Sequence, residues 1–163
     1  CLNNATFFTQ ARCASYLKNR TKMFNILEKY KSKGHFFYEK NDNLREICNA
    51  PKSGIGIYLI YALKKGKVEL TYIGSTGKIT QNGMIKTRKG GIYDRIVNGK
   101  QFGEIRSRAW NKQIIIEEIE ALDIYWYETF DNENSDIPAM VEGQTIQQFY
   151  EIYGKLPNWN KEY

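Results

Sequence analysis

Two strand-forming runs joined by a short polar turn constrain the fold of this chain more than any other feature. Residues 55–63 are nearly all β-branched, aromatic or aliphatic, which is typical of a strand buried on both faces. Residues 64–67 form a polar turn that contains a glycine able to adopt positive φ. From Val68 onward apolar and polar residues alternate, which predicts a second strand with Val68, Leu70 and Tyr72 on one face. The sequence therefore predicts a β-hairpin.

Each strand of this hairpin carries a tripeptide, Gly56-Ile57-Tyr58 in the first and Tyr72-Ile73-Gly74 in the second. Strand alternation places Tyr58 and Ile57 on opposite faces. One Gly-x-Tyr is common and usually reflects packing, but two tripeptides on neighbouring strands are much more specific. In order and separation they resemble the motifs of the GIY-YIG nuclease family, whose members cleave phosphodiester bonds of nucleic acids.

The resemblance covers roughly residues 54–161 and implies a catalytic set of Tyr58, Tyr72, Arg95, Glu142 and Asn160. In such a set Tyr58 positions or deprotonates the attacking water, and Tyr72 orients water or phosphate. Arg95 neutralises charge on the phosphate in the transition state. Glu142 holds a divalent metal, Mg²⁺ or Mn²⁺, which stabilises the departing oxygen, and Asn160 supports the site. A tyrosine base would need help from a nearby cation or metal-bound water, because the unperturbed pKa of tyrosine is ~10.

Two arginines, Arg95 and Arg88, are candidates for the catalytic arginine. Arg95 follows Tyr72 at a longer gap than in compact members of the family, so Arg88 is an alternative. The helical context of residues 92–96 favours Arg95, whereas Arg88 lies in a loop-like stretch. An expanded basic loop is similar to the restriction-enzyme branch of the family, but the histidine that some of those members carry after the arginine is missing.

The asparagine and the glutamate also have alternative readings. The segment ending at Asn160 resembles a closing Pro-x-x-Asn motif, but Asn158 lies in the same segment and the sequence does not choose between them. Taken alone, Glu142 would be explained by its favourable position near the start of a helix, where the helix dipole stabilises a carboxylate.

Charge is polarised along the chain. Residues 78–112 hold nine basic side chains against two acidic ones, whereas residues 113–138 hold eight acidic side chains and no basic one. A basic, glycine-rich stretch after the hairpin suits contact with a polyanion, although a solvated lysine-rich face would have the same composition. The candidate nucleic-acid-binding residues are Lys78, Lys86, Arg88, Lys89, Lys100, Arg106 and Arg108.

The remaining pattern predicts an α/β (α+β) fold with a small three-stranded antiparallel sheet flanked by helices. A short helix is expected after Gly91, a helix over residues 107–122, a third strand over 124–130, and a helix from Pro138 to Tyr153 that ends at Gly154. Residues 1–53 are expected to form an N-terminal helical extension, with a helix from Met23 and residues 1–22 dispensable. Residues 54–163 would form the GIY-YIG-like domain.

Composition limits the protein class. The 163 residues include 42% hydrophobic side chains, enough for one core, and no stretch reaches the ~18 apolar residues of a membrane span. Cys1, Cys13, Cys48 and His35 do not have the spacing of a zinc site, and an odd number of cysteines argues against structural disulfides. We expect an intracellular, cytoplasmic protein that does not interact with membranes.

The leading hypothesis is a metal-dependent DNA endonuclease of restriction, mobile-element or repair type, with RNA left open as a substrate. Cutting both strands would favour a homodimer or sequential nicking. The alternative is a nucleic-acid-binding module without turnover, which would need the basic loop but not Glu142. In a third interpretation the tyrosines are merely core residues of an interaction domain.

Overall fold

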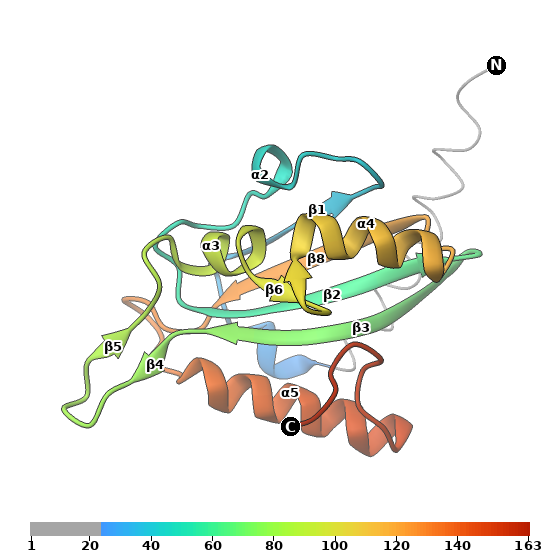
Figure 1. The fold of residues 1–163 in the computed structure, drawn as a ribbon. Coiled ribbons are helices and arrows are strands. Elements are labelled where there is room, and N and C mark those ends of the chain that lie inside the picture. The colour runs from blue at the N-terminus through green and yellow to red at the C-terminus, as the bar shows by residue number, and fades with distance from the viewer. Residues whose placement is uncertain (1–23) are drawn as a thin grey trace.

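A four-stranded antiparallel sheet organises residues 24–163, the part of the chain that the computed structural model describes (Figure 1). Its spatial order is β1 (Lys33–Tyr38), β8 (Ala121–Glu128), β2 (Gly56–Lys64) and β3 (Lys67–Thr76). The α+β class is confirmed, but the prediction of a three-stranded sheet is wrong. The fourth strand, β1, comes from the segment expected to be a helical extension and pairs with β8.

The central hairpin forms as the sequence predicts. Strand β2 pairs with β3 on one side and with β8 on the other, and all but its last two residues are buried. The turn residues Lys65 and Gly66 both adopt positive φ, 49° and 73°. Such a two-residue turn matches the right-handed twist of the flanking strands.

A β-bulge in β3 determines the face on which Tyr72 lies. Ile60 pairs with Tyr72, whereas Tyr61 pairs with Leu70, so Thr71 is an extra residue on its strand. The Thr71 hydroxyl donates to the carbonyl of Ile60 at 3.0 Å. Leu70 therefore packs in one core and Tyr72 against the other. The uniform alternation predicted from the sequence, with both side chains on one face, is wrong.

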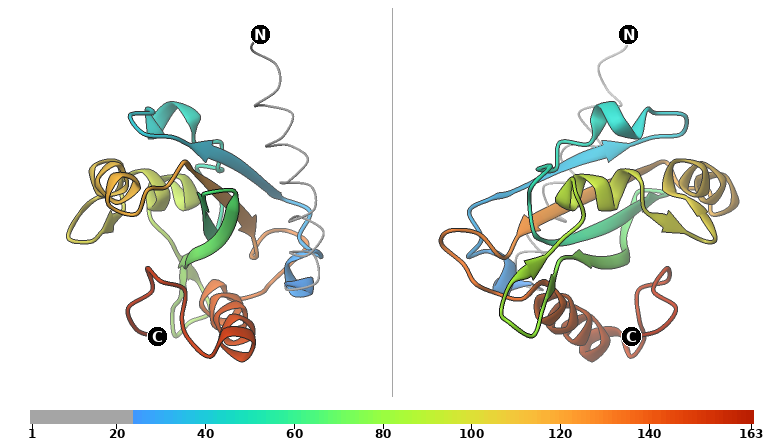
Figure 2. Two further views of the ribbon diagram at one scale, coloured as in Figure 1. Left: turned by 90° about the vertical axis from the view of Figure 1, so that its right-hand side faces the viewer. Right: turned by 60° about the vertical axis from the view of Figure 1, so that its left-hand side comes forward.

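Helices cover both faces of the sheet (Figures 1 and 2). One core contains side chains of α2 (Leu44–Ile47), α3 (Gly91–Val97) and α4 (Arg106–Ile116). The other contains side chains of α5 (Pro138–Tyr153) and residues at and around the short 3₁₀ helix η1 (Asn25–Leu27). As predicted, Tyr58 belongs to the first core and Ile57 to the second.

The predicted helix boundaries are confirmed where a glycine or proline marks the start or end of the helix. Helix α5 runs from Pro138 to Tyr153 and is ended by Gly154 at φ 66°, and α3 begins at Gly91. The helix predicted over residues 107–122 stops at Ile116, and the strand predicted over 124–130 begins earlier, at Ala121. Glu118 adopts a left-handed φ of 52° without being a glycine, so the sequence gives no sign of this break.

Two small hairpins fill the glycine-rich segment between β3 and α4. The first pairs β4 (Lys78–Ile79) with β5 (Ile85–Lys86) and extends away from the sheet in Figure 1, and we call residues 78–86 the β4–β5 arm. The second pairs β6 (Lys100–Gln101) with β7 (Glu104–Ile105).

Some predictions concern residues outside the described range. The helix expected from Met23 is represented within residues 24–32 only by η1, and the proposal that residues 1–22 are dispensable lies outside the described residues. Within residues 24–163, no helix has the length and apolarity needed to cross a membrane.

Candidate functional site

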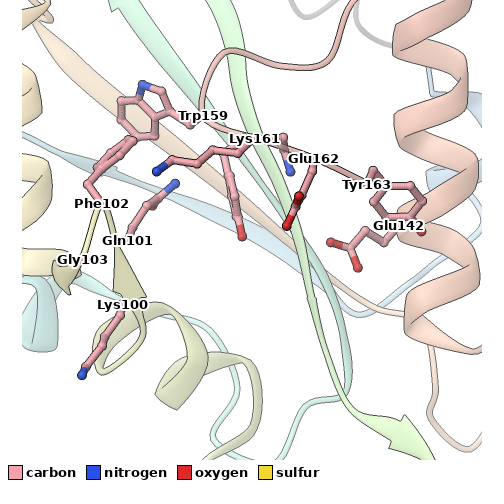
Figure 3. A pocket seen from close by; sticks show the side chains of 11 residues that line it. Lys100, Gln101, Phe102, Gly103, Glu142, Trp159, Lys161, Glu162 and Tyr163 are labelled. Atoms are coloured by element: carbon pink, nitrogen blue, oxygen red, sulfur yellow. The ribbon is translucent and has the colours of Figure 1, made fainter.

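The edge of the sheet formed by β3 borders a cavity of about 390 Å³ (Figure 3). Its walls come from Tyr72 of β3, Glu142 of α5, residues 100–103 of the β6–β7 hairpin and residues 159–163 at the end of the chain. Three residues of the predicted catalytic set, Tyr72, Glu142 and Asn160, therefore border one space. Tyr58 and Arg95 are not among the cavity-lining residues, but both lie close to Tyr72.

The two motif tyrosines are neighbours on adjacent strands, with ring centroids 5.9 Å apart. Gly74 makes this possible, because a Cβ at that position would lie 2.6 Å from the Tyr58 hydroxyl and 2.7 Å from the Tyr72 ring. Gly56 is needed for strand pairing, since its Cβ would lie 1.9 Å from the carbonyl oxygen of Tyr127. Both glycines of the tripeptides thus have steric reasons to be glycine.

The two tyrosines differ in access to the cavity. Tyr58 is fully buried, with 0% of its surface exposed, whereas Tyr72 is partly exposed. Burial, with a smaller contribution from Tyr58, raises the pKa of the Tyr72 hydroxyl above its usual value, against the opposing effect of Arg106 and Arg95. Tyr72 is therefore a hydrogen-bond donor at neutral pH, and of the two motif tyrosines it is the one that lines the cavity.

Helix α3 brings Arg95 to this tyrosine pair. The helix is held by a hydrogen bond from the Ile92 amide to the carbonyl of Gly54 at 2.9 Å. Arg95 is partly buried, and its pKa is raised chiefly by the adjacent Tyr58 hydroxyl, with smaller contributions from Tyr72 and Glu142. Its rival Arg88 is exposed and pairs with Asp94 at 3.4 Å. The geometry therefore brings Arg95, not Arg88, to the site.

Arg106 is the residue that the sequence interpretation misplaced. Predicted to lie on a nucleic-acid-binding surface, it is completely buried, because the helical register that buries Trp110 and Ile114 also buries the residue four positions earlier. Its guanidinium donates to the Tyr58 hydroxyl at 2.6 Å and to the carbonyl of Arg95 at 2.5 Å. It also lies 5.0 Å from the Tyr58 ring centroid. Extending the Trp110–Ile114 spacing back by one turn would have revealed it.

Glu142 approaches the cavity from α5, on the opposite face of the sheet from α3. It accepts a hydrogen bond from the Ser75 hydroxyl at 2.5 Å. Burial raises the pKa of its carboxyl above the usual value, and this effect outweighs the opposing influence of Ser75 and Arg95. A partly buried carboxyl with a raised pKa is a group that gains from a nearby cation.

Asn160 attaches the end of the chain to the sheet edge. Its amide accepts from the Ile73 N–H at 3.0 Å and donates to the Ile73 carbonyl at 2.9 Å. Asn158 is exposed and bonds only Lys155 among the described residues, at 3.3 Å. The structure therefore favours Asn160 as the supporting asparagine, with a structural role at β3.

The other candidate nucleic-acid-binding residues are exposed. Within residues 24–163, five of them have no acidic partner within salt-bridge distance, whereas Arg88 pairs with Asp94. Lys78 and Lys86 face each other across the β4–β5 pair, where like charges repel. The unpaired members are Lys78, Lys86, Lys89, Lys100 and Arg108.

A metal at this site would depend on few protein ligands. Among the described residues, no group of three or more histidine, cysteine, aspartate or glutamate side chains lies together. The carboxylates of Glu142 and Glu162 both line the cavity (Figure 3). Mg²⁺ is commonly held by one or two carboxylates, with water and substrate oxygens completing its octahedron, so these residues fit such an ion.

Comparison with known proteins gives no relative from which a role could be transferred. No family model, curated protein or solved structure matches this chain. The functional interpretation therefore depends on the motifs and on the geometry described above.

Proposed function

We propose that this protein is a divalent-metal-dependent endonuclease that hydrolyses DNA phosphodiester bonds, in restriction, repair or a mobile element. The observation that carries the proposal is the convergence of Tyr72, Arg95 and Glu142 at one sheet edge, from β3, α3 and α5. Arg95 interacts electrostatically with both Tyr72 and Glu142, and a hydroxyl donor, a guanidinium and a carboxylate are groups that phosphodiester hydrolysis needs.

The residues suggest a division of work. Arg95 would bind the scissile phosphate, since its planar fork grips two oxygens and stays charged at any relevant pH. Tyr72 would donate a hydrogen bond to a phosphate oxygen or to the attacking water. Tyr58 would hold the Tyr72 ring in position from the core side. Its hydroxyl is fully buried and bonded to Arg106, so it does not contact water. This assigns Tyr58 a positioning role in place of the base role expected from the resemblance.

Glu142 would hold the metal, Mg²⁺ or Mn²⁺, with Ser75 orienting its carboxylate. A divalent ion there supplies Lewis-acid stabilisation of the departing oxygen. The raised pKa of Glu142 implies competition between proton and metal, so we expect the metal to bind more weakly as the pH falls.

DNA would be held by the exposed basic side chains of the β4–β5 arm and the loop that follows it. A two-stranded ribbon can enter a DNA groove, and lysines without acidic partners are free to neutralise phosphates. One such site in each chain would require a homodimer or two successive nicks to cut both strands.

The decisive experiment is cleavage of plasmid DNA in Mg²⁺ by the protein and its Glu142→Ala variant at matched DNA occupancy. We expect the parent to convert supercoiled plasmid to nicked or linear product and the variant to bind without cutting. Tyr72→Phe should cut about a hundredfold more slowly, since the loss of one donor to developing charge costs at least about that much. Equal cutting by the parent and Glu142→Ala would refute the proposal.

One observation supports a second candidate, a nucleic-acid-binding module without turnover. Tyr58 is fully buried, so within the described residues the tyrosine expected to act as base has no access to water in this structure. If the parent binds DNA and cuts no substrate with Mg²⁺ or Mn²⁺, the binding module becomes the better description.

A further inference from the structure

The end of the cavity farthest from Glu142 has a distinct lining that the proposed catalysis does not use. Figure 3 shows Gln101, Phe102 and Trp159 at this end, with Lys161 reaching across. Gln101 and Phe102 belong to the β6–β7 hairpin, and Trp159 and Lys161 to the C-terminal segment. Two aromatic rings, an amide and an ammonium therefore meet beside the catalytic groups.

Gln101 presents a buried donor that lacks an acceptor. Its Oε1 accepts from the indole N–H of Trp110 at 2.9 Å, and because an indole nitrogen only donates, this bond defines the orientation of the amide. The Nε2 group is buried in a side chain that is 8% exposed, and it has no hydrogen-bond partner within residues 24–163. Buried polar groups are nearly always paired, so this amide in a cavity wall is available to donate to a ligand.

Lys161 adds a second donor to the cavity lining. Lys161 and Gln101 both line the cavity, and in Figure 3 the Lys161 side chain extends toward the end where Gln101 lies. Both groups are hydrogen-bond donors, so a ligand at this end of the cavity would gain from carrying an acceptor.

The adjacent wall is aromatic. Phe102 stands at the turn of the β6–β7 hairpin with a φ of 53°, a left-handed conformation that is unfavourable for a bulky residue. Its ring meets that of Trp159 edge to face, with centroids 5.4 Å apart, and it remains 37% exposed. An aromatic side chain held in a strained, exposed position beside a cavity is well placed to stack on a planar ligand.

We propose that this part of the cavity binds an unstacked nucleobase next to the scissile phosphate, with Phe102 stacking on the base and Gln101 donating to an acceptor nitrogen or oxygen on its edge. This inference rests on the proposed function for the position of the phosphate. A base fits better than a second phosphate, because a phosphate gains nothing from the exposed ring of Phe102. In a duplex the base would have to leave the stack, as it does in enzymes that extrude nucleotides.

The test separates base contacts from phosphate contacts. Binding of a short oligothymidylate is compared with that of an abasic oligonucleotide of equal length, by fluorescence anisotropy in metal-free buffer that prevents cleavage. The parent should bind the thymidylate at least about tenfold more tightly, since stacking alone, or one good edge contact alone, is of that order. Gln101→Ala and Phe102→Ala should reduce this preference severalfold while their affinity for the abasic strand stays unchanged.

Gln147→Ala and Phe37→Ala, both exposed and outside the cavity lining, are the matched controls and should keep the full preference. Equal binding of both strands by the parent would overturn the base subsite without touching the nuclease proposal, which plasmid cleavage tests separately. A preference that survives both cavity substitutions would overturn the assignment of Gln101 and Phe102. Failure to bind either strand would overturn this inference and the DNA-binding part of the proposed function together.

Discussion

Arg106 places a positive charge in the core beside Tyr58 without an ion-pair partner among the described residues. It bonds the Tyr58 hydroxyl and a backbone carbonyl, and its Nε has no partner within the part of the chain described. Gly99 makes room for it, since a Cβ there would lie 2.9 Å from the guanidinium. Burying a charge without a counter-ion is unfavourable for folding, so its presence beside the tyrosine pair suggests a functional reason.

Arg106→Met should therefore affect cleavage more than stability. Removing a poorly compensated buried charge should leave the free energy of unfolding unchanged or higher. Loss of the cation that holds Tyr58 should slow cleavage at least tenfold. Urea denaturation and a plasmid assay measure the two effects, with the exposed Lys40→Met as the control. A large loss of stability with unchanged cleavage would show that Arg106 is purely structural.

Glu142→Gln should stabilise the protein at neutral pH while abolishing cleavage. Burial raises the pKa of this carboxyl, so between the unfolded and folded pKa values the folded protein binds more protons than the unfolded chain. The stabilising contribution of the carboxyl is then full below about 4.5, its ordinary value, and is lost as the pH rises through the folded pKa.

The measurement is the thermal midpoint of the parent and Glu142→Gln from pH 4 to pH 8. The gain of the variant should grow with pH and vanish near pH 4. Glu151→Gln, an exposed position on the same helix, is the control substitution. A variant less stable than the parent at pH 8 would contradict the burial argument.

At the scale of elements, the sequence patterns predicted regular strands and helices but missed the irregularities that interrupt them. The β2–β3 hairpin was predicted from its turn residues and α3 from Gly91 at its start. Helix α5 was predicted from Pro138 at its first position and Gly154 at its end. The bulge at Thr71 and the helix break at Glu118 could not be predicted, because neither residue carries a conformational signal of its own. In both places tertiary packing overrides local preference.

We predict that the β4–β5 arm contacts DNA phosphates through Lys78 and Lys86. Lys78→Ala combined with Lys86→Ala should weaken DNA binding and reduce the slope of log affinity against log salt by about two, one for each lost phosphate contact. Thermal stability should stay the same or rise slightly, because two facing like charges are removed. Anisotropy titrations at several salt concentrations measure the slope, with exposed Lys40→Ala and Lys67→Ala as the control pair. An unchanged slope would exclude the arm from the interface.

At the scale of the molecule, the sheet extends across the boundary that the sequence suggested near residue 53. Strand β1 pairs with β8 along its whole length, and Tyr38 and Leu44 are buried in the core beside Tyr58 and Ile60. The sequence predicted most of the candidate site through the paired tripeptides, but not the four-stranded sheet that supports it. Strand β1 lacks a turn signal linking it to its partner, so its pairing could not be derived locally.

A fragment of residues 54–163 should consequently fail to fold cooperatively. It would expose one edge of β8 and leave a hole where Tyr38 and Leu44 pack. Thermal unfolding followed by circular dichroism should show one sharp transition for the full chain and none for the fragment. A fragment with an equally sharp transition at the same temperature would establish residues 54–163 as an independent domain.

The bulge at Thr71 also divides strand β3 into two halves that differ in the amino-acid substitutions they can accept. Before the bulge, Val68 and Leu70 need only be apolar and of suitable size, because they face a core that can repack. After it, Tyr72 borders the cavity, Ile73 is held on both backbone groups by Asn160, and Gly74 has no room for a Cβ. One strand thus contains a stretch whose side chains can be exchanged for other apolar ones and, directly after Thr71, a stretch where packing, hydrogen bonds and steric limits leave little room for substitution.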